Sequence, residues 1–284
     1  TTLNRLVLYM NEITSLDVSN NTALTGLQCN SNQLISLDVS ANTALTYFQC
    51  GSNQLTGLDV SANTDLTELS CESNDLTSLD VSSNTALTHL NFENNELTSL
   101  DVSSNTALTG LSCYNNQLTS LDISSNTALK QFYCQENQIT SLDVSSNTAL
   151  TDLSCAVNQI TSLDVSSNTA LGLLWCQSNQ LTYLNMKNGL TDQITQFDAR
   201  DNSLTCIETL DPDYATANWT NANIDEGVSF DVICGAEART HWYVATTGSD
   251  NSGSGTLASP LSSIQTAINA TTNGDTVSVA AGTY

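Results

Sequence analysis

Leucines recur along the chain at a fixed spacing, and this is the strongest structural signal in the sequence. The stretch from Leu45 reads LTYFQCGSNQLTGLDVSANTD, and the next stretch, from Leu66, reads LTELSCESNDLTSLDVSSNTA. This 21-residue unit opens, without a slip in register, at Leu3, Leu24, Leu45, Leu66, Leu87, Leu108, Leu129, Leu150 and Leu171. A tenth unit begins at Ile194 after a two-residue insertion around Gly189. Such a period predicts a leucine-rich-repeat solenoid in which each unit forms one coil.

The apolar residues within a unit alternate in two places. In the first half, Phe48 and Cys50 have the spacing of a strand with both side chains facing the core. Stacked coils would place these strands in parallel, about 4.8 Å apart, in an inner sheet on the order of 48 Å long. In the second half, Leu58 and Val60 flank Asp59, and Ser, Thr, Asn and Val favour a second short strand on the back over a helix. The predicted fold class is a mainly β leucine-rich-repeat horseshoe with a parallel inner sheet, short back strands and little helix.

An asparagine occupies the ninth position of the units, counted from the opening leucine. It stands at Asn11, Asn32, Asn53, Asn74, Asn95, Asn116, Asn137, Asn158 and Asn179. An amide both donates and accepts hydrogen bonds, so we expect stacked copies to pair the turn backbone left open after each strand.

Seven of the nine cysteines share the sixth position of the unit. They are Cys29, Cys50, Cys71, Cys113, Cys134, Cys155 and Cys176, and Leu8 and Phe92 take their place in two units. Parallel Cβ atoms on adjacent coils lie about 4.8 Å apart, which is longer than the roughly 3.8 Å of a disulfide. We therefore expect buried free thiols that act as small hydrophobic residues. No C-x-x-C motif or neighbouring histidine pair favours a metal site.

Aspartates recur at position 15 of the units, at Asp17, Asp38, Asp59, Asp80, Asp101, Asp122, Asp143 and Asp164. Carboxylates stacked on adjacent coils repel one another, so something should offset that repulsion. Hydrogen bonds from nearby Ser and Thr are the favoured explanation, and bound Ca²⁺ is the alternative.

Sequence variation concentrates at positions 3, 5, 7 and 8, which we expect to be outward residues of the first strand. A rigid sheet with variable side chains is how solenoids present a binding face. The residues predicted to bind a ligand there are Tyr47, Glu68, Glu72, His89, Glu93, Tyr114, Tyr133, Asp152 and Trp175. Aromatic side chains are favoured anchors for protein or sugar ligands, and the carboxylates favour a basic or cation-bridged partner. The alternative is that these side chains only pack across neighbouring coils.

Composition excludes several function classes. The chain has 5 Lys and Arg against 29 Asp and Glu, a formal net charge of −24, and so lacks the basic stripe that nucleic-acid binding needs. No apolar run approaches the roughly 18 residues that span a bilayer, so we expect no membrane insertion. The two histidines, His89 and His241, fall in different predicted domains, and no catalytic constellation is evident. We therefore expect a monomeric, non-enzymatic protein without a cofactor or a metal.

Cys206 and Cys234 lie outside the cysteine ladder and flank a stretch without repeats. The last coil of a solenoid exposes apolar core, which a cap must cover. A disulfide between these two cysteines would hold that cap, stabilise the fold by ~3 kcal/mol, and place the protein in an oxidising compartment.

The 21-residue unit LTxLxCxxNQLTSLDVSxNTA, with its stacked cysteine, resembles the cysteine-ladder repeats of internalin-J-like surface proteins of Gram-positive pathogens. It is also similar to the surface repeat proteins of Bacteroidetes-type bacteria. The likeness covers roughly residues 3–205. It implies a secreted or cell-surface bacterial adhesin-like protein that recognises ligands through its sheet, with no catalytic residues to transfer.

A second resemblance lies at the C-terminus. The segments HWYVA from His241, PLSSIQ from Pro260 and GDTVSVAAGTY from Gly274 look like the opening of a pectate-lyase-like right-handed parallel β-helix. We therefore predict a solenoid over 1–205, a cap over 206–234, a linker over 235–240 and a truncated β-helix start over 241–284. The leading functional prediction is a non-catalytic extracellular recognition or adhesion module that binds protein or glycan. The alternative is a targeting module of a larger secreted, polysaccharide-active β-helix enzyme.

Overall fold

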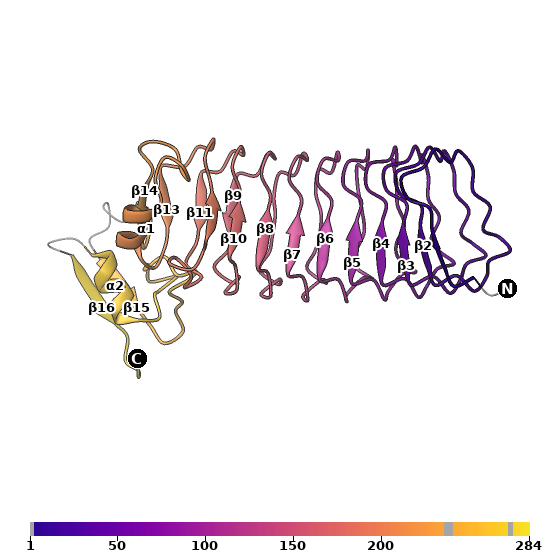
Figure 1. Ribbon diagram of the computed structural model, residues 1–284. Coiled ribbons are helices and arrows are strands. Elements are labelled where there is room, and N and C mark those ends of the chain that lie inside the picture. The colour runs from indigo at the N-terminus through magenta and orange to yellow at the C-terminus, as the bar shows by residue number, and fades with distance from the viewer. Residues whose placement is uncertain (1–2, 236–240, 272–274) are drawn as a thin grey trace.

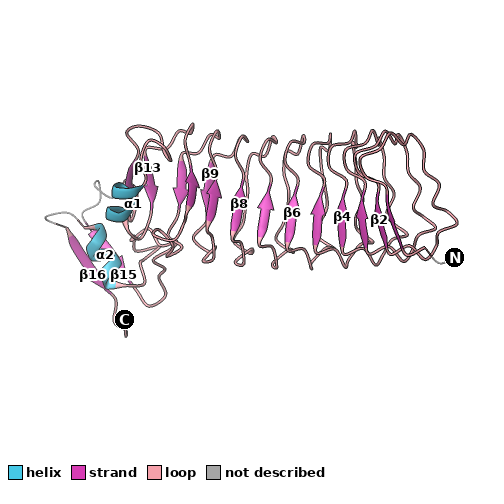
Figure 2. Ribbon diagram, in the orientation of Figure 1, coloured by secondary structure: helices cyan, strands magenta, loops and turns pink. Residues whose placement is uncertain are grey.

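The protein is an elongated solenoid whose coils stack along one axis (Figure 1). The computed structural model describes residues 3–235, 241–271 and 275–284. The N-terminus lies at one end of the solenoid, and a small helix-containing module lies beside the other end (Figures 1 and 2). Successive front strands pair with a register of 21 residues, for example Arg5 with Gly26, which confirms the predicted coil length.

One face of the solenoid carries a parallel sheet with one strand from each repeat. In the described residues it has ten strands: β1 (Arg5–Val7), β2 (Gly26–Gln28), β3 (Tyr47–Gln49), β4 (Glu68–Ser70), β5 (His89–Asn91), β6 (Gly110–Ser112), β7 (Gln131–Tyr133), β8 (Asp152–Ser154), β10 (Leu173–Trp175) and β12 (Gln196–Asp198). We call this the front sheet. The fold class is the predicted one, a mainly β leucine-rich-repeat solenoid.

The core is a continuous column of apolar side chains inside the coils. In the coil that begins at Leu108, the buried side chains are Leu108, Leu111, Cys113, Leu118, Leu121 and Ile123. Each coil repeats these positions, so the apolar residues of one coil are covered by its neighbours rather than by its own residues. The seven ladder cysteines are free and fully buried, as predicted. Burial raises the pKa of the Cys29 and Cys155 thiols to about 12, so these thiols are not nucleophilic at neutral pH.

Two ladders of asparagine side chains hold the turns. The amide nitrogen of Asn53, at position 9, donates to the carbonyls of Cys50 (3.0 Å) and Cys29 (3.1 Å), and its oxygen accepts from the Leu34 N–H (3.0 Å). This confirms the predicted role of the position-9 asparagines. A second ladder, whose role the sequence did not reveal, occupies position 19. There the amide nitrogen of Asn63 donates to the carbonyls of Val39 (3.0 Å) and Asn42 (2.9 Å), and Asn63 is fully buried.

The back half of the coils differs along the solenoid. Back strands form toward the C-terminal end, where β9 (Ser162–Asp164), β11 (Tyr183–Asn185), β13 (Cys206–Glu208) and β14 (Ser229–Asp231) make a four-stranded parallel sheet. The expectation of a back strand in every unit therefore holds only there. In the earlier coils the back is extended but bonded through side chains: the Val60 carbonyl accepts from the Asn84 amide (2.9 Å), and Asp59 accepts from the Ser61 N–H (2.9 Å).

The last coils are closed by helix α1 (Pro212–Asn218) and by strand β14. Asp211 caps α1 by accepting from the Tyr214 N–H. The Trp219 ring, which is buried, packs against Phe197 and Phe230 with ring centroids 4.5 and 5.6 Å apart. These aromatic rings cover the apolar column where the repeats end.

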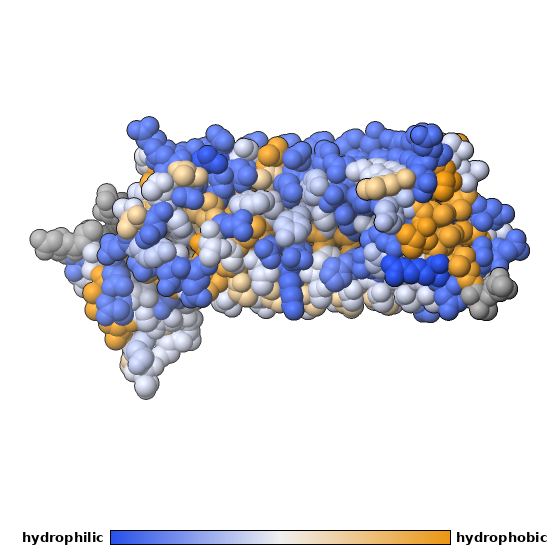
Figure 3. Space-filling model, in the orientation of Figure 1, coloured by the Kyte–Doolittle hydropathy of each residue, from blue (hydrophilic) through white to orange (hydrophobic). Residues whose placement is uncertain are grey.

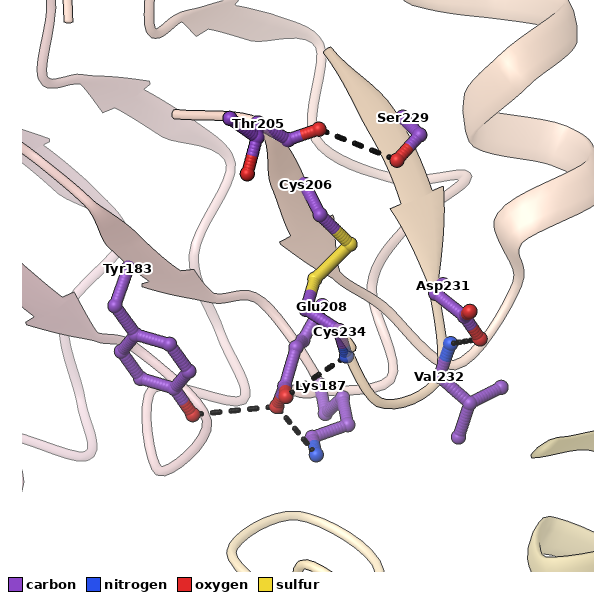
Figure 4. The surroundings of a disulfide bond; sticks show 9 residues. All are labelled: Tyr183, Lys187, Thr205, Cys206, Glu208, Ser229, Asp231, Val232 and Cys234. Atoms are coloured by element: carbon purple, nitrogen blue, oxygen red, sulfur yellow. Dashed lines mark hydrogen bonds and ion pairs between the residues drawn. A yellow bond between two sulfur atoms is a disulfide. The ribbon is translucent and has the colours of Figure 1, made fainter. Parts of the chain in front are cut away.

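A disulfide joins Cys206, on β13, to Cys234, which follows β14 (Figure 4). Beside it, the carboxylate of Glu208 forms a buried ion pair with Lys187 (2.7 Å). The same carboxylate accepts from the Tyr183 hydroxyl (3.2 Å) and the Cys234 N–H (3.2 Å). Covalent, ionic and hydrogen bonds thus converge where the chain leaves the solenoid.

The C-terminal module has its own small core. Strands β15 (His241–Val244) and β16 (Thr276–Val279) pair in parallel, and helix α2 (Ile264–Ala270) contacts both strands. The buried core includes Trp242 and Leu261, and the Trp242 indole donates to Asp275 (3.1 Å). The module touches the solenoid where Asn185 donates to the Asn251 carbonyl (2.8 Å). Residues 236–240 of the predicted linker lie outside the described residues.

Candidate functional site

The predicted ligand-binding residues gather on the front sheet in three parallel rows. Positions 3 and 5 flank the inward leucine or phenylalanine of each front strand, so their side chains share the outer face, and position 7 follows directly. The position-3 row carries Tyr47, Glu68, His89 and Asp152. The position-5 row carries Tyr133 and Trp175, and the position-7 row carries Glu72, Glu93 and Tyr114. None of the nine is buried: His89 and Trp175 are exposed, and the other seven are half-buried.

Position 8 does not belong to this variable surface in the way the sequence suggested. Its residue has a positive φ in every coil, from 51° at Asn115 to 56° at Ser31, Glu136 and Asp201. This left-handed turn carries the chain from the front strand to the position-9 asparagine. Asn tolerates such a backbone, whereas a β-branched residue such as Val157 is strained in it. Local geometry therefore restricts position 8, which is a turn position.

The carboxylates of the front face lie close to small neighbours. The Ser70 hydroxyl donates to Glu72 (2.6 Å), and the Ser112 hydroxyl donates to Glu93 (3.0 Å). The Glu72 carboxylate also occupies the space where a Cβ on residue 51 would lie, and residue 51 is a glycine. Small residues of the same coil or of an adjacent coil therefore seat these acidic side chains.

These carboxylates make the front face electronegative. The pKa of Tyr47 is raised by its burial and then by Glu68. Burial followed by Glu93 raises the pKa of Tyr114, and burial followed by Asp152 raises that of Tyr133. Three tyrosines spread over coils 3 to 7 thus feel negative charge, which favours a positively charged partner.

Two aromatic side chains flank a buried hydroxyl at the C-terminal half of the sheet. Ser154 pairs in register with Tyr133 on one side and Trp175 on the other. It is 1% exposed, and its hydroxyl oxygen has no hydrogen-bond partner among the described residues. Trp175 itself remains 37% exposed, so the outer face of its ring is open to solvent.

The front sheet has a hollow over Gly110, with a volume of about 290 Å³. Three predicted residues, Glu68, His89 and Tyr133, line it. The other lining residues are Leu69, Ser70, Leu90, Asn91, Gly110, Leu111, Ser112 and Gln131. Tyr47 lies instead in a separate depression with Arg5, whose guanidinium carbon is 6.0 Å from the Tyr47 ring centroid. Asp152 and Trp175 lie outside both, so the structure divides the predicted set.

The hollow depends on residues that the sequence analysis did not select. Gly110, Ser70 and Ser112 are small, and each lies next to a larger side chain on an adjacent coil. A difference in side-chain size between successive units could have revealed these small residues. At position 3, for example, Gly110 stands between His89 and Gln131. Looking only for large or charged residues misses the gap between them.

The aspartates of position 15 lie on the other side of the coil and are engaged by their own backbone. In each of the eight, one carboxylate oxygen accepts from the N–H of the serine two residues later, at 2.8–2.9 Å. Within the described ranges, no group of three or more His, Cys, Asp or Glu side chains is arranged to hold a metal ion. Neither described helix has the length and apolarity to cross a bilayer.

Neither a protein-family model nor a curated protein matches the chain. Solved structures with the same architecture do match it. The functional domain of InlJ from Listeria monocytogenes, which includes a cysteine ladder, is 35% identical and superposes with a TM-score of 0.61. That match covers 72% of this chain and 55% of the InlJ domain.

Two further structures share the fold. The leucine-rich-repeat protein LIC12759 of Leptospira interrogans is 24% identical with a TM-score of 0.64, and the match covers 70% of this chain and 55% of that protein. The leucine-rich-repeat ectodomain of the Arabidopsis thaliana receptor kinase GASSHO1/SCHENGEN3, in complex with CASPARIAN STRIP INTEGRITY FACTOR 2, is 22% identical. Its TM-score is 0.70, with 81% of this chain and 30% of the ectodomain covered. The chain thus spans about half the length of the InlJ domain and of LIC12759.

Proposed function

We propose that this internalin-like, cysteine-ladder leucine-rich-repeat solenoid is a non-catalytic recognition module that binds a protein partner through its front sheet. The observation that carries the proposal is that structural and outward-facing side chains occupy different positions of each coil. Side chains at positions 9, 15 and 19 make the internal hydrogen bonds, whereas those at positions 3, 5 and 7 face outward. A rigid, parallel sheet with variable outward side chains supports recognition of an extended surface.

The character of that face favours a protein ligand with positive charge. Glu68 and Tyr133 line the same hollow, and Glu93 lies beside Tyr114. Aromatic anchors with a polar group dominate protein interfaces, and complementary charge accelerates association and excludes wrong partners. Such a ligand on another cell or surface would make the protein an adhesin.

A location outside the cytoplasm is part of the proposal. The disulfide between Cys206 and Cys234 forms and persists in oxidising compartments. The seven ladder thiols survive there because they are buried, and a buried thiol does not ionise readily.

We also propose that the C-terminal region, residues 241–284, is the start of a right-handed parallel β-helix. The parallel pairing of β15 with β16, 35 residues apart in register, is consistent with one coil of such a helix, and α2 covers that coil. The division into a solenoid to residue 205 and a cap over 206–234 is likewise proposed. Limited proteolysis tests it: cleavage at 235–240 should release a solenoid that keeps its melting temperature.

Selection from a random peptide library displayed on phage tests the main proposal. Selected clones should bind the chain and lose binding to a front variant, Tyr133→Ala with Trp175→Ala. The matched control is Asp59→Asn with Asp80→Asn, which alters exposed side chains away from the front sheet and should leave binding intact. Equal loss in both variants would overturn the assignment to the front sheet. Binding on a glycan array without any selected peptide would overturn the assignment to a protein ligand.

A further inference from the structure

We propose that the hollow over Gly110 holds a single arginine side chain of the protein partner. This inference rests on the proposed function, because it assigns the ligand group to one point of the front sheet. It goes further by selecting a pure hydrogen-bond donor over a sugar or an apolar side chain. Three properties of the hollow support it: its shape, its charge and the orientation of its hydroxyl groups.

The shape follows from small side chains bordered by large ones. Gly110 lies at the centre, and Ser70 and Ser112 supply two more short side chains. The His89 side chain leans across toward the glycine, because a Cβ at residue 110 would lie 2.8 Å from the His89 Cδ2 atom. Tyr133 borders the hollow on the opposite side in chain order. A long, flexible side chain from a partner can therefore enter between the histidine and the tyrosine.

The charge of the hollow is negative. Glu68 is part of the lining and forms no ion pair with a described residue. Glu72 and Glu93 lie directly beside the hollow, since they are bonded to the lining serines. The lining, drawn from the described residues, contains no Lys or Arg; Lys130 precedes Gln131 in the chain but is not part of it. A cation entering here meets carboxylates and no lysine or arginine of the lining.

The hydroxyl groups distinguish a guanidinium from a sugar. Each lining serine donates its only hydroxyl hydrogen to a carboxylate, Ser70 to Glu72 and Ser112 to Glu93. Both oxygens therefore present lone pairs to the hollow and act as acceptors. A sugar hydroxyl both donates and accepts, whereas a guanidinium has five N–H donors and no acceptor. An acceptor-rich hollow fits the guanidinium.

Tyr133 adds a preference for arginine over lysine. A guanidinium is planar, stacks on aromatic rings and is more weakly hydrated than an ammonium group. The half-buried Tyr133 ring, at the edge of the hollow, offers such a stacking surface. Glu68 lies on the other side and can accept two parallel N–H bonds. Lysine would satisfy the charge but neither the stacking nor the paired hydrogen bonds.

The test is an NMR titration of the ¹⁵N-labelled chain with N-acetyl-arginine amide, N-acetyl-lysine amide and N-acetyl-alanine amide. We expect the arginine compound to shift the amide resonance of Gly110 in a saturable way, with weaker binding of the lysine compound and none of the alanine compound. Glu68→Gln should weaken arginine binding about 10-fold, which corresponds to one charge-assisted contact. Glu96→Gln, the same charge change at an exposed position outside the hollow, should not.

A filling variant gives a second, independent readout. Ser112→Tyr places at position 5 a side chain that the next coil already carries as Tyr133, so the fold should accept it. This variant should abolish the arginine-induced shift. The amide resonances of the other coils should stay where they are in the folded parent chain. The proposal is overturned if the arginine and alanine compounds behave alike, or if Ser112→Tyr binds arginine as well as the parent chain. If the parent chain shows no arginine-induced shift but still binds library-selected peptides, this inference is refuted and the proposed function stands.

Discussion

Both the front and the back of each coil are hydrogen-bonded to neighbouring coils, but by different means. On the front, backbone groups of neighbouring strands bond to each other, as when the Gly110 N–H donates to the Thr88 carbonyl (3.1 Å). On the back of the earlier coils, side chains take that role, as when the Asn105 amide donates to the Val81 carbonyl (3.0 Å). The face shown in Figure 3 is mostly hydrophilic, and apolar side chains gather there at the N-terminal end of the solenoid.

This difference explains where the sequence varies. A backbone ladder does not depend on the outward side chains of the front strands, so Arg5, Glu68 and Leu173 can occupy equivalent positions. A side-chain ladder fixes the residue type, because only an amide of the right length reaches both carbonyls. The LDVSxN segment is therefore repeated almost unchanged, and the front is where recognition can evolve. Four predictions test this contrast, from the largest expected effect to the smallest.

The strongest test removes one amide from the back ladder. Asn105 is fully buried and donates to the carbonyls of Val81 and Asn84. Asn105→Ala should lower the free energy of unfolding by about 4 kcal/mol, because two buried acceptors lose their donor. Gln131→Ala, on the front, should change it by less than about 0.5 kcal/mol. Urea unfolding of the two variants measures both values, and equal effects would remove the contrast.

The disulfide should act on the back of the last coils. Cys206 lies on the back strand β13, and its partner Cys234 follows β14. Cys206→Ser with Cys234→Ser should destabilise the fold by about 3 kcal/mol. Hydrogen exchange should show faster opening of β13 and β14, while front strands β6 and β7 keep their protection. Uniform loss of protection would show that the solenoid unfolds as one unit.

Replacing the strained turn residue between front and back should stabilise the protein. Val157 has φ 52°, and the equivalent residue in two other coils is Asn94 or Asn115. Val157→Asn should increase stability by about 1 kcal/mol, because Asn adopts the left-handed region at lower cost. Thermal unfolding measures the change. A lower melting temperature for Val157→Asn would show that the valine makes a compensating contact.

The smallest effect concerns pH. Hydrogen bonds from the neighbouring serines lower the pKa of the position-15 aspartates at Asp17, Asp38, Asp59, Asp80, Asp101, Asp122 and Asp143. A depressed folded-state pKa gives stability that is present above the unfolded pKa and is lost as pH falls through the folded value. The melting temperature should therefore decrease as the pH is lowered beneath about 4. The decrease should be less steep in Asp101→Asn than in the parent chain. An unchanged slope would assign the acid sensitivity to other groups.

Much of the fold could be predicted because each core position and each turn position recurs in one unit after another. The leucine period gives the coil, the Cys50 position gives the inward face, and Asn53 gives the turn. The back strands were harder to predict. LDVS alternates like a strand in one coil after another, yet among the described residues the back strands that pair with one another are β9, β11, β13 and β14. Periodicity reports which side chains face inward, but it does not report whether a backbone or a side chain completes the hydrogen bonds.

The proposed binding face could be chosen from the sequence, but its internal arrangement could not. Variation at positions 3, 5 and 7 pointed to the front sheet, where Glu68, His89 and Tyr133 meet around the hollow. The hollow itself depends on the absence of a side chain at Gly110 and on how His89 leans, which is a property of packing between coils. Position 8 was misjudged because its constraint is a backbone angle, which Ser, Asn, Glu and Val all adopt here.

Saturation mutagenesis of one coil, residues 108–128, selected for folding on a cell surface, tests the central contrast most directly. Positions 112 and 114 on the front should accept most residue types, whereas Asn116 and Asn126 should accept almost none. That result would show that the back ladders define the fold and leave the front free for recognition. Similar tolerance at Asn126 and Ser112 would contradict it.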